Sequence, residues 1–320
     1  MNIDKNIKKS IRKVFGNTLA QVGELNEDIV VLDADLSCST QTKIFADKFP
    51  HRFFNCGIAE QNMIATAAGL ATQGKVPFAA TFAMFATGRT YDQIRNGVCY
   101  SDLNVKIIGT HGGVTVGEDG ATHQALEDVS LMRGLPNMTV IVPSDCNECE
   151  QVLEYAAKHQ GPVYIRISRN SLPDIYSSDY KFDINKAVVL KNGSDVTIVS
   201  NGDIMAEVCK AAEILQTAGI DAEVISLPVV KPFDSDTIIK SAKKTNFVVS
   251  VENHSINGGI GSAVCETLSE NYPVKVLRIG INDEFGQSGD VKDLLKHYGL
   301  DAQSLANRIE KTYDSIKIGN

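Results

Sequence analysis

Short apolar runs alternate with amphipathic stretches along most of the chain. Apolar side chains recur at helical spacing across residues 10–24, and the apolar run 29–32 that follows is typical of a buried strand. The same alternation predicts, further along the first half, strands at 76–82, 105–109, 139–142 and 163–167 and helices at 60–71 and 89–100. Strands that alternate with helices indicate βαβ units, and therefore a parallel sheet covered on both faces.

Two of the predicted helices have informative sequences. The helix at 60–71 is rich in alanine and lacks a clear polar face, so we expect it to pack against neighbours on nearly all sides. The helix after the strand at 139–142 is expected to be capped by Asp145, because Glu148 follows three residues later.

The alternation is interrupted over residues 170–193, which contain Pro173 and no long apolar run. It then restarts, with strands predicted at 196–200, 222–227, 247–251 and 274–279 and helices at 205–218, 234–243, 260–270, 291–297 and 302–313. We therefore predict the α/β class, with two doubly wound domains: a larger one with a mostly parallel sheet over residues 1–180, and a smaller one over residues 181–320.

Composition narrows the class of protein. The 320 residues suffice for about two domains, and 43% hydrophobic with 22% charged residues is ordinary for a globular protein. Lys and Arg total 31 against 39 Asp and Glu, a formal charge of −8, which argues against nucleic acid or an anionic membrane as partner. No apolar run reaches the roughly 18–20 residues that span a bilayer, and the basic start has no apolar signal segment. Seven cysteines favour reduced thiols in the cytoplasm over a disulfide framework.

Polar side chains gather where several predicted strands end. Asp35 and Ser39 follow the strand at 29–32, His111 and Arg169 follow two later strands, and Glu60 opens a helix. Because the carboxyl ends of parallel strands meet at one edge of a sheet, these residues suggest a site for a polar, anionic ligand.

Each of these side chains also has a purely structural explanation. Glu60 could complement a helix dipole, and His111 could be a buried histidine bonded to backbone. Arg169 could be a surface cation, and Asp35 and Ser39 could satisfy their own turn.

Other motifs are weaker. Cys146 and Cys149 form a lone C-x-x-C without a second pair, so a structural zinc site is not expected and their role stays open. Gly259-Ile260-Gly261 lacks the third glycine of a dinucleotide fingerprint, and the chain has neither a P-loop nor a G-x-S-x-G motif.

Residues 55–63, Asn-Cys-Gly-Ile-Ala-Glu-Gln-Asn-Met, resemble the strand-to-helix motif of the pyrimidine-binding domain in thiamine diphosphate enzymes. Residues 117–124, Gly-Glu-Asp-Gly-Ala-Thr-His-Gln, are similar to the far more specific G-E-D-G-x-T-H-Q segment of transketolases. Four further segments match transketolases in the same order, at residues 32–36, 168–173, 251–254 and 257–263. The resemblance covers nearly the whole chain, but only the C-terminal half of an ordinary transketolase.

This resemblance implies a subunit rather than a whole enzyme. The family holds Mg²⁺ and the diphosphate through a G-D-G segment and a later Asn, and no G-D-G occurs in this sequence. We therefore expect the C-terminal subunit of a split transketolase, inactive alone, whose N-terminal partner supplies the diphosphate and metal half. The implied assembly is a heterotetramer in which this chain also associates as a dimer. The implied reaction moves a two-carbon ketol unit between ketose and aldose phosphates, with thiamine diphosphate as cofactor.

The resemblance assigns Glu60 as the catalytic acid that hydrogen-bonds N1′ of the cofactor and favours its imino tautomer. A carboxyl buried among apolar groups has a raised pKa and can donate that bond, and Glu60 follows Ile58 and precedes the apolar pair at 63–64. Ile58 is expected to contact the cofactor, and Asp35 to lie near it at the subunit junction.

The family's aromatic pair that stacks on the aminopyrimidine falls at Phe82 and Phe85, although both could be core aromatics. A third aromatic of the family falls at Gly88, which departs from the pattern. The residues that match the family's phosphate end are Arg12, Ser39, His111 and Arg169. Those that match its sugar-hydroxyl contacts are Asp119 and His123, and His123 also suits proton transfer at the substrate oxygen.

Alternatives remain at this point. The chain could belong to a 1-deoxyxylulose-5-phosphate synthase, to the β-subunit of a 2-oxoacid dehydrogenase, or to a non-catalytic paralogue that binds or regulates a partner. The G-E-D-G-x-T-H-Q segment favours transketolase, and Glu60 together with His123 counts against a binding module.

Overall fold

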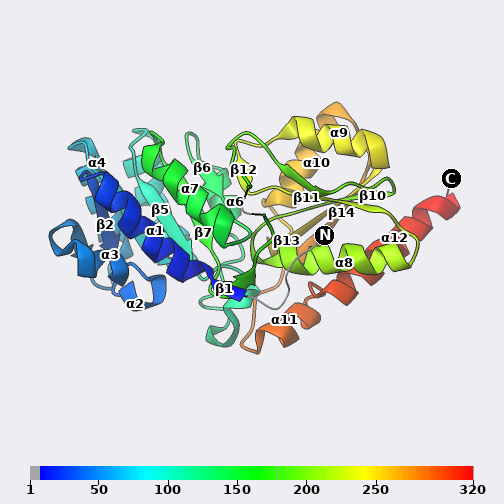
Figure 1. The fold of residues 1–320 in the computed structure, drawn as a ribbon, viewed down its shortest axis with the longest axis horizontal. Helices are drawn as coiled ribbons and strands as arrows, with labels where there is room; N and C mark the ends of the chain where they lie inside the picture. Colours follow the sequence, from blue (N-terminus) through cyan, green and yellow to red (C-terminus); the bar gives the residue numbers. More distant parts are fainter. Residues whose placement is uncertain (1–7, 178, 320) are drawn as a thin grey trace.

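The computed structural model describes residues 8–177 and 179–319, which form two α/β units side by side (Figure 1). The strands of the first unit are β1 (Lys8–Ser10), β2 (Ile29–Asp33), β3 (Phe53–Asn55), β4 (Val76–Phe82), β5 (Lys106–Thr110), β6 (Thr139–Ile141), β7 (Val163–Ile167) and β8 (Ser171–Pro173). Its helices are α1 (Ile11–Leu25), α2 (Ser37–Thr40), α3 (Lys43–Lys48), α4 (Glu60–Thr72), α5 (Ala83–Thr87), α6 (Asp128–Arg133) and α7 (Cys146–Lys158), with 3₁₀ turns η1 (Pro50–Arg52) and η3 (Val114–Asp119) and the π-helix η2 (Gln93–Cys99).

The second unit has its own sheet. Its strands are β9 (Val188–Lys191), β10 (Val196–Ser200), β11 (Ala222–Ser226), β13 (Phe247–Ser255) and β14 (Lys275–Ile281), and β12 (Val229–Lys231) leaves for the first sheet. Its helices are η4 (Gly202–Ile204), α8 (Met205–Thr217), α9 (Ser235–Thr245), α10 (Ile260–Asn271), α11 (Val291–His297) and α12 (Ala302–Gly319).

Both sheets are mostly parallel, which confirms the predicted α/β class. The larger sheet has the order β12-β6-β7-β5-β4-β2-β3, and only β12 runs antiparallel to its neighbour. The smaller sheet has the order β14-β13-β10-β11-β9, with β9 antiparallel at one edge. Since β12 comes from the second half of the chain, the two halves share a sheet, a connection that the sequence pattern did not predict.

Helices cover both faces of the larger sheet (Figure 1). On one face, apolar side chains of α1 and α7 form a buried core with the strands, as Phe15, Leu19 and Val152 illustrate. On the other face, side chains of α4, η2 and α6 form a second core, which continues without a break into α9 and α10 of the second unit. The two units are therefore joined by apolar packing as well as by β12.

Two helices differ from their predicted form. The helix predicted at 89–100 is a π-helix over Gln93–Cys99. Its backbone hydrogen bonds join residues five apart, whereas the predicted α-helix joins residues four apart. The expectation that α4 packs on nearly all sides is wrong within this chain: Met63, Ile64 and Ala67 are buried, but Gln61 and Ala65 are exposed. The small side chains of α4 therefore did not allow the buried face to be told from the exposed face in the sequence.

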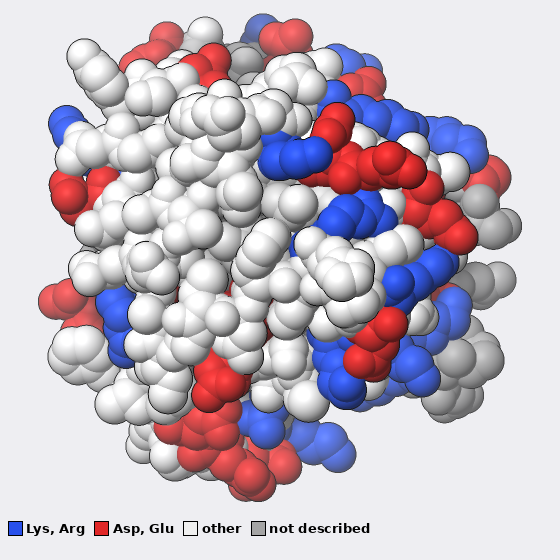
Figure 2. All heavy atoms as spheres, turned by 90° about the vertical axis from the view of Figure 1, so that its left-hand side faces the viewer, with Lys and Arg blue, Asp and Glu red and all other residues white. Residues whose placement is uncertain are grey.

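The side of the molecule that carries α4 is poor in charge. Figure 2 shows this side as a broad area without Lys, Arg, Asp or Glu, with charged side chains gathered around its margins. Two large apolar side chains next to α4 are exposed, Ile58 by 78% and Phe54 by 41%. Among the described helices, none combines the length and the apolarity needed to cross a bilayer.

Asp145 caps α7 as predicted, and it also binds the backbone of a second segment. One carboxylate oxygen accepts from the Glu148 backbone N–H at 2.8 Å, and the other accepts from the backbone of Ile175 and Tyr176 at 2.7 and 2.8 Å. Asp145 thus ties the segment that leads to the second unit to the start of α7. Because Asp145 is fully buried, water cannot replace it at these three donors.

We expect Asp145→Ala to lower the free energy of unfolding by about 3 kcal/mol, because several buried backbone donors lose their acceptor. Urea unfolding followed by circular dichroism measures the change. Asp47→Ala is the control. Within the described part of the chain Asp47 pairs only with Lys43 on the surface of α3, and its loss should cost less than about 0.5 kcal/mol. Equal effects of the two substitutions would contradict the role given to Asp145.

Candidate active site

Most of the predicted site residues lie at or just after the carboxyl ends of β2, β3, β4, β5 and β7, and Arg12 lies at the start of α1. Asp33, fully buried at the end of β2, organises the first loop: its carboxylate accepts from the Leu36 backbone at 2.6 Å and from the Thr40 and Thr42 hydroxyls at 2.8 Å each. Burial raises the pKa of Asp33, although these bonds oppose the shift. This carboxylate fixes the path of the loop that carries Asp35 and Ser39.

The end of β3 lies beside the loop that carries Asp35. The Asn55 side-chain oxygen accepts from the backbone of Asp35 at 3.1 Å and of Gly57 at 3.0 Å, and so joins the ends of β2 and β3. Asp35 and Ile58 are both exposed at this rim.

Glu60 is buried, only 2% exposed, at the first position of α4. Its two carboxylate oxygens lie 2.8 and 2.7 Å from one guanidinium nitrogen of Arg89, a residue on the turn between α5 and η2. The predicted apolar surroundings of Glu60 are therefore only part of its environment. Sequence reasoning missed Arg89, and the available signal was its position directly after Gly88, where the family's third aromatic is absent.

Aromatic rings connect Glu60 with the predicted substrate side. The Arg89 guanidinium lies 4.5 Å from the centre of the Phe85 ring. Phe85 lies nearly parallel to Phe82 with ring centres 6.0 Å apart, and meets His123 edge-on at 5.3 Å. Phe82 in turn stacks on His111 at 3.9 Å. The structure thus brings Phe82, Phe85 and both histidines into one cluster.

The four residues of the predicted phosphate end also come together. Arg12, at the start of α1, donates to the backbone carbonyl of Ser39 at 2.6 Å and to that of Arg169 at 3.0 Å. Arg169 donates to the Val116 carbonyl and lies 3.3 Å from a carboxylate oxygen of Asp119. Pairing of β1 with β8 sets this geometry, because it places α1 beside the segment after β7.

His111 completes this group as a neutral side chain. Burial, with the positive charges of Arg12 and Arg169 and the nearby His123, lowers the pKa of His111 to about 3. Its Nδ1 lies 2.8 Å from the Thr110 hydroxyl. Two guanidinium groups and a neutral imidazole are therefore available to an anion.

The Gly112–Gly120 loop is held by the second unit. The Asn253 side chain accepts from the Val114 backbone at 2.9 Å and donates to the Thr115 hydroxyl at 2.7 Å. Gly120 has a φ of +77°, and a side chain there would collide with Ser288 of the second unit. This loop carries Asp119 and leads to His123, so residues outside the predicted site position two members of it.

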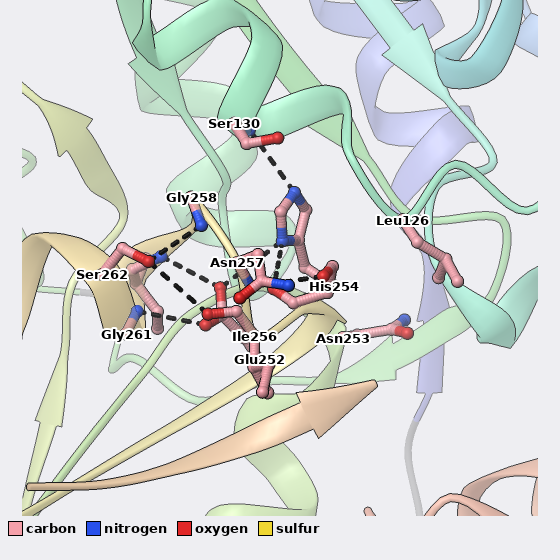
Figure 3. Close-up of polar contacts among 12 residues, drawn as sticks. Leu126, Ser130, Glu252, Asn253, His254, Ile256, Asn257, Gly258, Gly261 and Ser262 are labelled. Atoms are coloured by element: carbon pink, nitrogen blue, oxygen red, sulfur yellow. Dashed lines mark hydrogen bonds and ion pairs between the residues drawn. The ribbon is translucent and has the colours of Figure 1, made fainter. Parts of the chain in front are cut away.

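The motif at 251–263 forms a buried polar cluster behind that loop (Figure 3). The Glu252 carboxylate accepts from the backbone of Ile260 and Gly261, the first residues of α10, at 2.9 and 3.1 Å. Burial raises the pKa of Glu252 to about 7 and lowers that of His254 to about 4. His254 Nδ1 donates to the Ser255 carbonyl at 2.6 Å and Nε2 accepts from the Ser130 backbone at 3.4 Å, so the ring is neutral with its proton on Nδ1. The Gly-x-Gly segment at 259–261 therefore receives a carboxylate of the chain itself.

Cysteine and metal chemistry are not evident here. Cys146 and Cys149 lie buried on α7, and burial raises the pKa of Cys146 to about 12. Such thiols are poor nucleophiles and ligands. Across residues 8–177 and 179–319, no group of three His, Cys, Asp or Glu side chains is arranged to hold a metal ion.

Comparison with known proteins matches both halves of the chain. The family model described as the transketolase pyrimidine binding domain matches residues 7–174, and that of the transketolase C-terminal domain matches residues 185–305. A provisionally named transketolase C-terminal section of Methanocaldococcus jannaschii is 51% identical over 95% of this chain and 96% of its own length. The 6-deoxy-6-sulfo-D-fructose transketolase subunit SqwH of Clostridium sp. (strain MSTE9) is 42% identical over 92% of each chain.

A solved structure agrees with these matches. A split-gene transketolase, solved as an inactive β4 tetramer, superposes with a TM-score of 0.89 at 48% identity over 95% of this chain and 98% of that chain. Fold, site and sequence together show that the chain belongs to the transketolase family. Within that family it is the C-terminal part of a split transketolase.

The low pKa of His111 leads to a prediction about stability. A histidine whose pKa is about 3 when folded and 6.5 when unfolded takes up a proton on unfolding between these values, so stability falls as the pH drops through this window. Between pH 7.5 and pH 5 the loss from His111 is about 2 kcal/mol. We expect His111→Asn to reduce the acid-induced loss of unfolding free energy by about this amount in urea titrations at the two pH values. An unchanged loss would show that His111 titrates normally.

Proposed function

We propose that this chain, joined to an N-terminal subunit, transfers a two-carbon ketol unit between ketose and aldose phosphates with thiamine diphosphate as cofactor. The observation that carries the proposal is the continuity of the site. Glu60 and Phe85 are joined through Arg89, and the aromatic cluster then runs through Phe82 to His111 beside the two cations of the anion site. A transketolase needs these two ends, one for the cofactor ring and one for the substrate phosphate, in one cleft.

The residues at the cofactor end suit an aminopyrimidine. A buried carboxyl is available for a ring nitrogen, and the face of Phe85 is available for a planar ring, as its contact with a planar guanidinium supports. When bound, thiamine diphosphate would supply an acidic ring C–H group, whose carbon can attack a ketose carbonyl once its proton has been removed. Glu60 would hold a proton at N1′ of the pyrimidine, while Phe82 and Phe85 keep the ring in place and exclude water.

The other end of the site suits an anionic sugar. Arg12 and Arg169 would bind the phosphate, with Ser39 and neutral His111 donating or accepting single hydrogen bonds. Asp119 would accept from a sugar hydroxyl, and His123, half-buried against Phe85, would move a proton to or from the substrate oxygen. The SqwH relative is named for a sulfonated sugar, so a sulfonate is a second anion that such a clamp could accept.

The diphosphate and Mg²⁺ would be bound mainly by the partner subunit. The uncharged side that carries the exposed face of α4 supports this arrangement, because burying it against another chain costs no ion desolvation (Figure 2). Glu60 begins the same helix, so a partner packed there would complete the cleft beside it. A cytoplasmic heterotetramer, in which this chain also pairs with a second copy, is the assembly we propose.

Reconstitution tests the proposal. This chain alone should show no ketol transfer, whereas its mixture with the N-terminal subunit, Mg²⁺ and thiamine diphosphate should convert xylulose 5-phosphate and ribose 5-phosphate in a coupled assay. Glu60→Gln should lower kcat of the mixture at least about 100-fold, because an amide cannot exchange a proton with N1′. Full activity of this chain alone would overturn the split-enzyme proposal.

The matched control for Glu60→Gln is Glu24→Gln, which neutralises an exposed carboxylate paired with Lys48. It should leave kcat unchanged. Analytical ultracentrifugation should find the same assembly for both variants, so that a loss of turnover is not a loss of the complex. Near-normal turnover with Gln at position 60 would remove that residue from the mechanism.

Removal of the Arg169 side chain should separate phosphorylated from unphosphorylated substrates. We expect Arg169→Ala to raise KM for sugar phosphates about 10–100-fold, because a charge-assisted pair is lost, and to change KM for unphosphorylated analogues much less. Arg308→Ala on α12 is the control and should change neither. Equal effects on both substrate classes would mean that Arg169 acts through the loop of Asp119 rather than on a phosphate.

A further inference from the structure

Arg89 contacts the two side chains that the proposed function assigns to the cofactor ring, Glu60 and Phe85. Its guanidinium meets both oxygens of Glu60, at 2.8 and 2.7 Å, and lies 4.5 Å from the centre of the Phe85 ring. A guanidinium is a planar cation that donates hydrogen bonds from its edge and stacks with its face. An aminopyrimidine protonated at N1′ is likewise a planar ring with a donor edge, so both groups suit the same carboxylate and the same aromatic face.

Only one of the two planar groups can use Glu60 and Phe85 at a time. Glu60 is 2% exposed and belongs to a helix, so it has little freedom to move, whereas the Arg89 side chain is 45% exposed. The Arg89 side chain is therefore the group that can leave. Solvent can hydrate it once it turns away, which keeps the cost of leaving small.

The Arg89 backbone is fixed independently of its side chain. The Gln61 side-chain amide donates to the Arg89 carbonyl at 3.1 Å and so holds the turn against α4. The preceding residue, Gly88, is exposed and has no side chain that could restrict the Arg89 side chain. Rotation of the Arg89 side chain alone can therefore open the space above Phe85, with no change in the turn.

We infer that Arg89 is a built-in substitute for the aminopyrimidine ring, which pairs with Glu60 and covers Phe85 until the cofactor displaces it. The inference rests on the proposed function, because it takes Glu60 and Phe85 as the cofactor surface. It gives the chain a means to keep its buried carboxylate paired while the ring is absent. Cofactor binding is then a competition, and the affinity for thiamine diphosphate is lower than the cleft alone would give.

The competition is measured by calorimetric titration of thiamine diphosphate into the complex of this chain with its N-terminal subunit, in the presence of Mg²⁺. We expect Arg89→Ala to lower Kd about tenfold, because the cofactor no longer has to break an ion pair. Arg89→Gln should give a similar gain while keeping most of the side-chain volume. The control is Arg95→Ala in the same segment. Among the described residues the Arg95 side chain bonds only the adjacent Asn96, so the Kd of this variant should equal that of the wild type.

A double-mutant cycle assigns the gain to Glu60. In a Glu60→Gln background, Arg89→Ala should change Kd less than about twofold, because the ion pair is already absent. An unchanged or weaker affinity of Arg89→Ala and Arg89→Gln would overturn the inference and make Arg89 a cofactor ligand or a bystander. If the wild-type complex bound no thiamine diphosphate, the proposed function would fall as well, so the two failures are distinguishable.

Discussion

The side-chain amide of Asn253 holds the loop on which the geometry of the site depends. That loop passes through glycines with positive φ at 113, 117 and 120, and such residues add no side-chain packing to fix its path. Asn253 satisfies the buried N–H of Val114 and the hydroxyl of Thr115, and the Arg166 guanidinium holds the Asn253 carbonyl at 2.8 Å. Buried donors without acceptors are costly, so the second unit determines where Asp119 and His123 stand although it contributes no predicted site residue.

The repeated alternation of strands and helices made the fold predictable. The position of the candidate site was predictable because ligands of parallel sheets bind at the carboxyl ends of the strands. Every predicted strand of the first unit is present. Ser39 and Arg169 share the guanidinium of Arg12, and His111 stacks on Phe82. Asp35 instead lies exposed beside Asn55. The pattern failed where a contact joins distant segments. β12 is three residues long and pairs with β6 across the unit boundary, and the partner of Glu60 is an arginine 29 residues away. Neither relation leaves a periodic signal in the sequence.

Two guanidinium groups lie close together at the proposed anion site, and one of them, that of Arg169, has an acidic partner in Asp119. Burial and the neighbouring Arg169 lower the pKa of Arg12, which shows that the pair is electrostatically unfavourable without a ligand. Both guanidinium groups are held by backbone carbonyls, whose partial charges cannot balance a full positive charge. Asp119 is the nearest acid to Arg169, at 3.3 Å. An anion that entered would relieve the repulsion, and therefore binding energy at this end is available before any chemistry occurs.

Under the proposed function, the first turn of α4 would link catalysis to assembly. Glu60 is buried, while Gln61 and Ala65 of the same helix are exposed. A rigid helix cannot move one face without the other, so a subunit that packs on the outer face also fixes the orientation of the Glu60 carboxylate. Because Gln61 holds the turn of Arg89 from that outer side, the same contact would also reach the group that competes for Glu60. In the proposed assembly, partner binding and cofactor binding would therefore act on one short segment, which gives a physical reason why activity would need both.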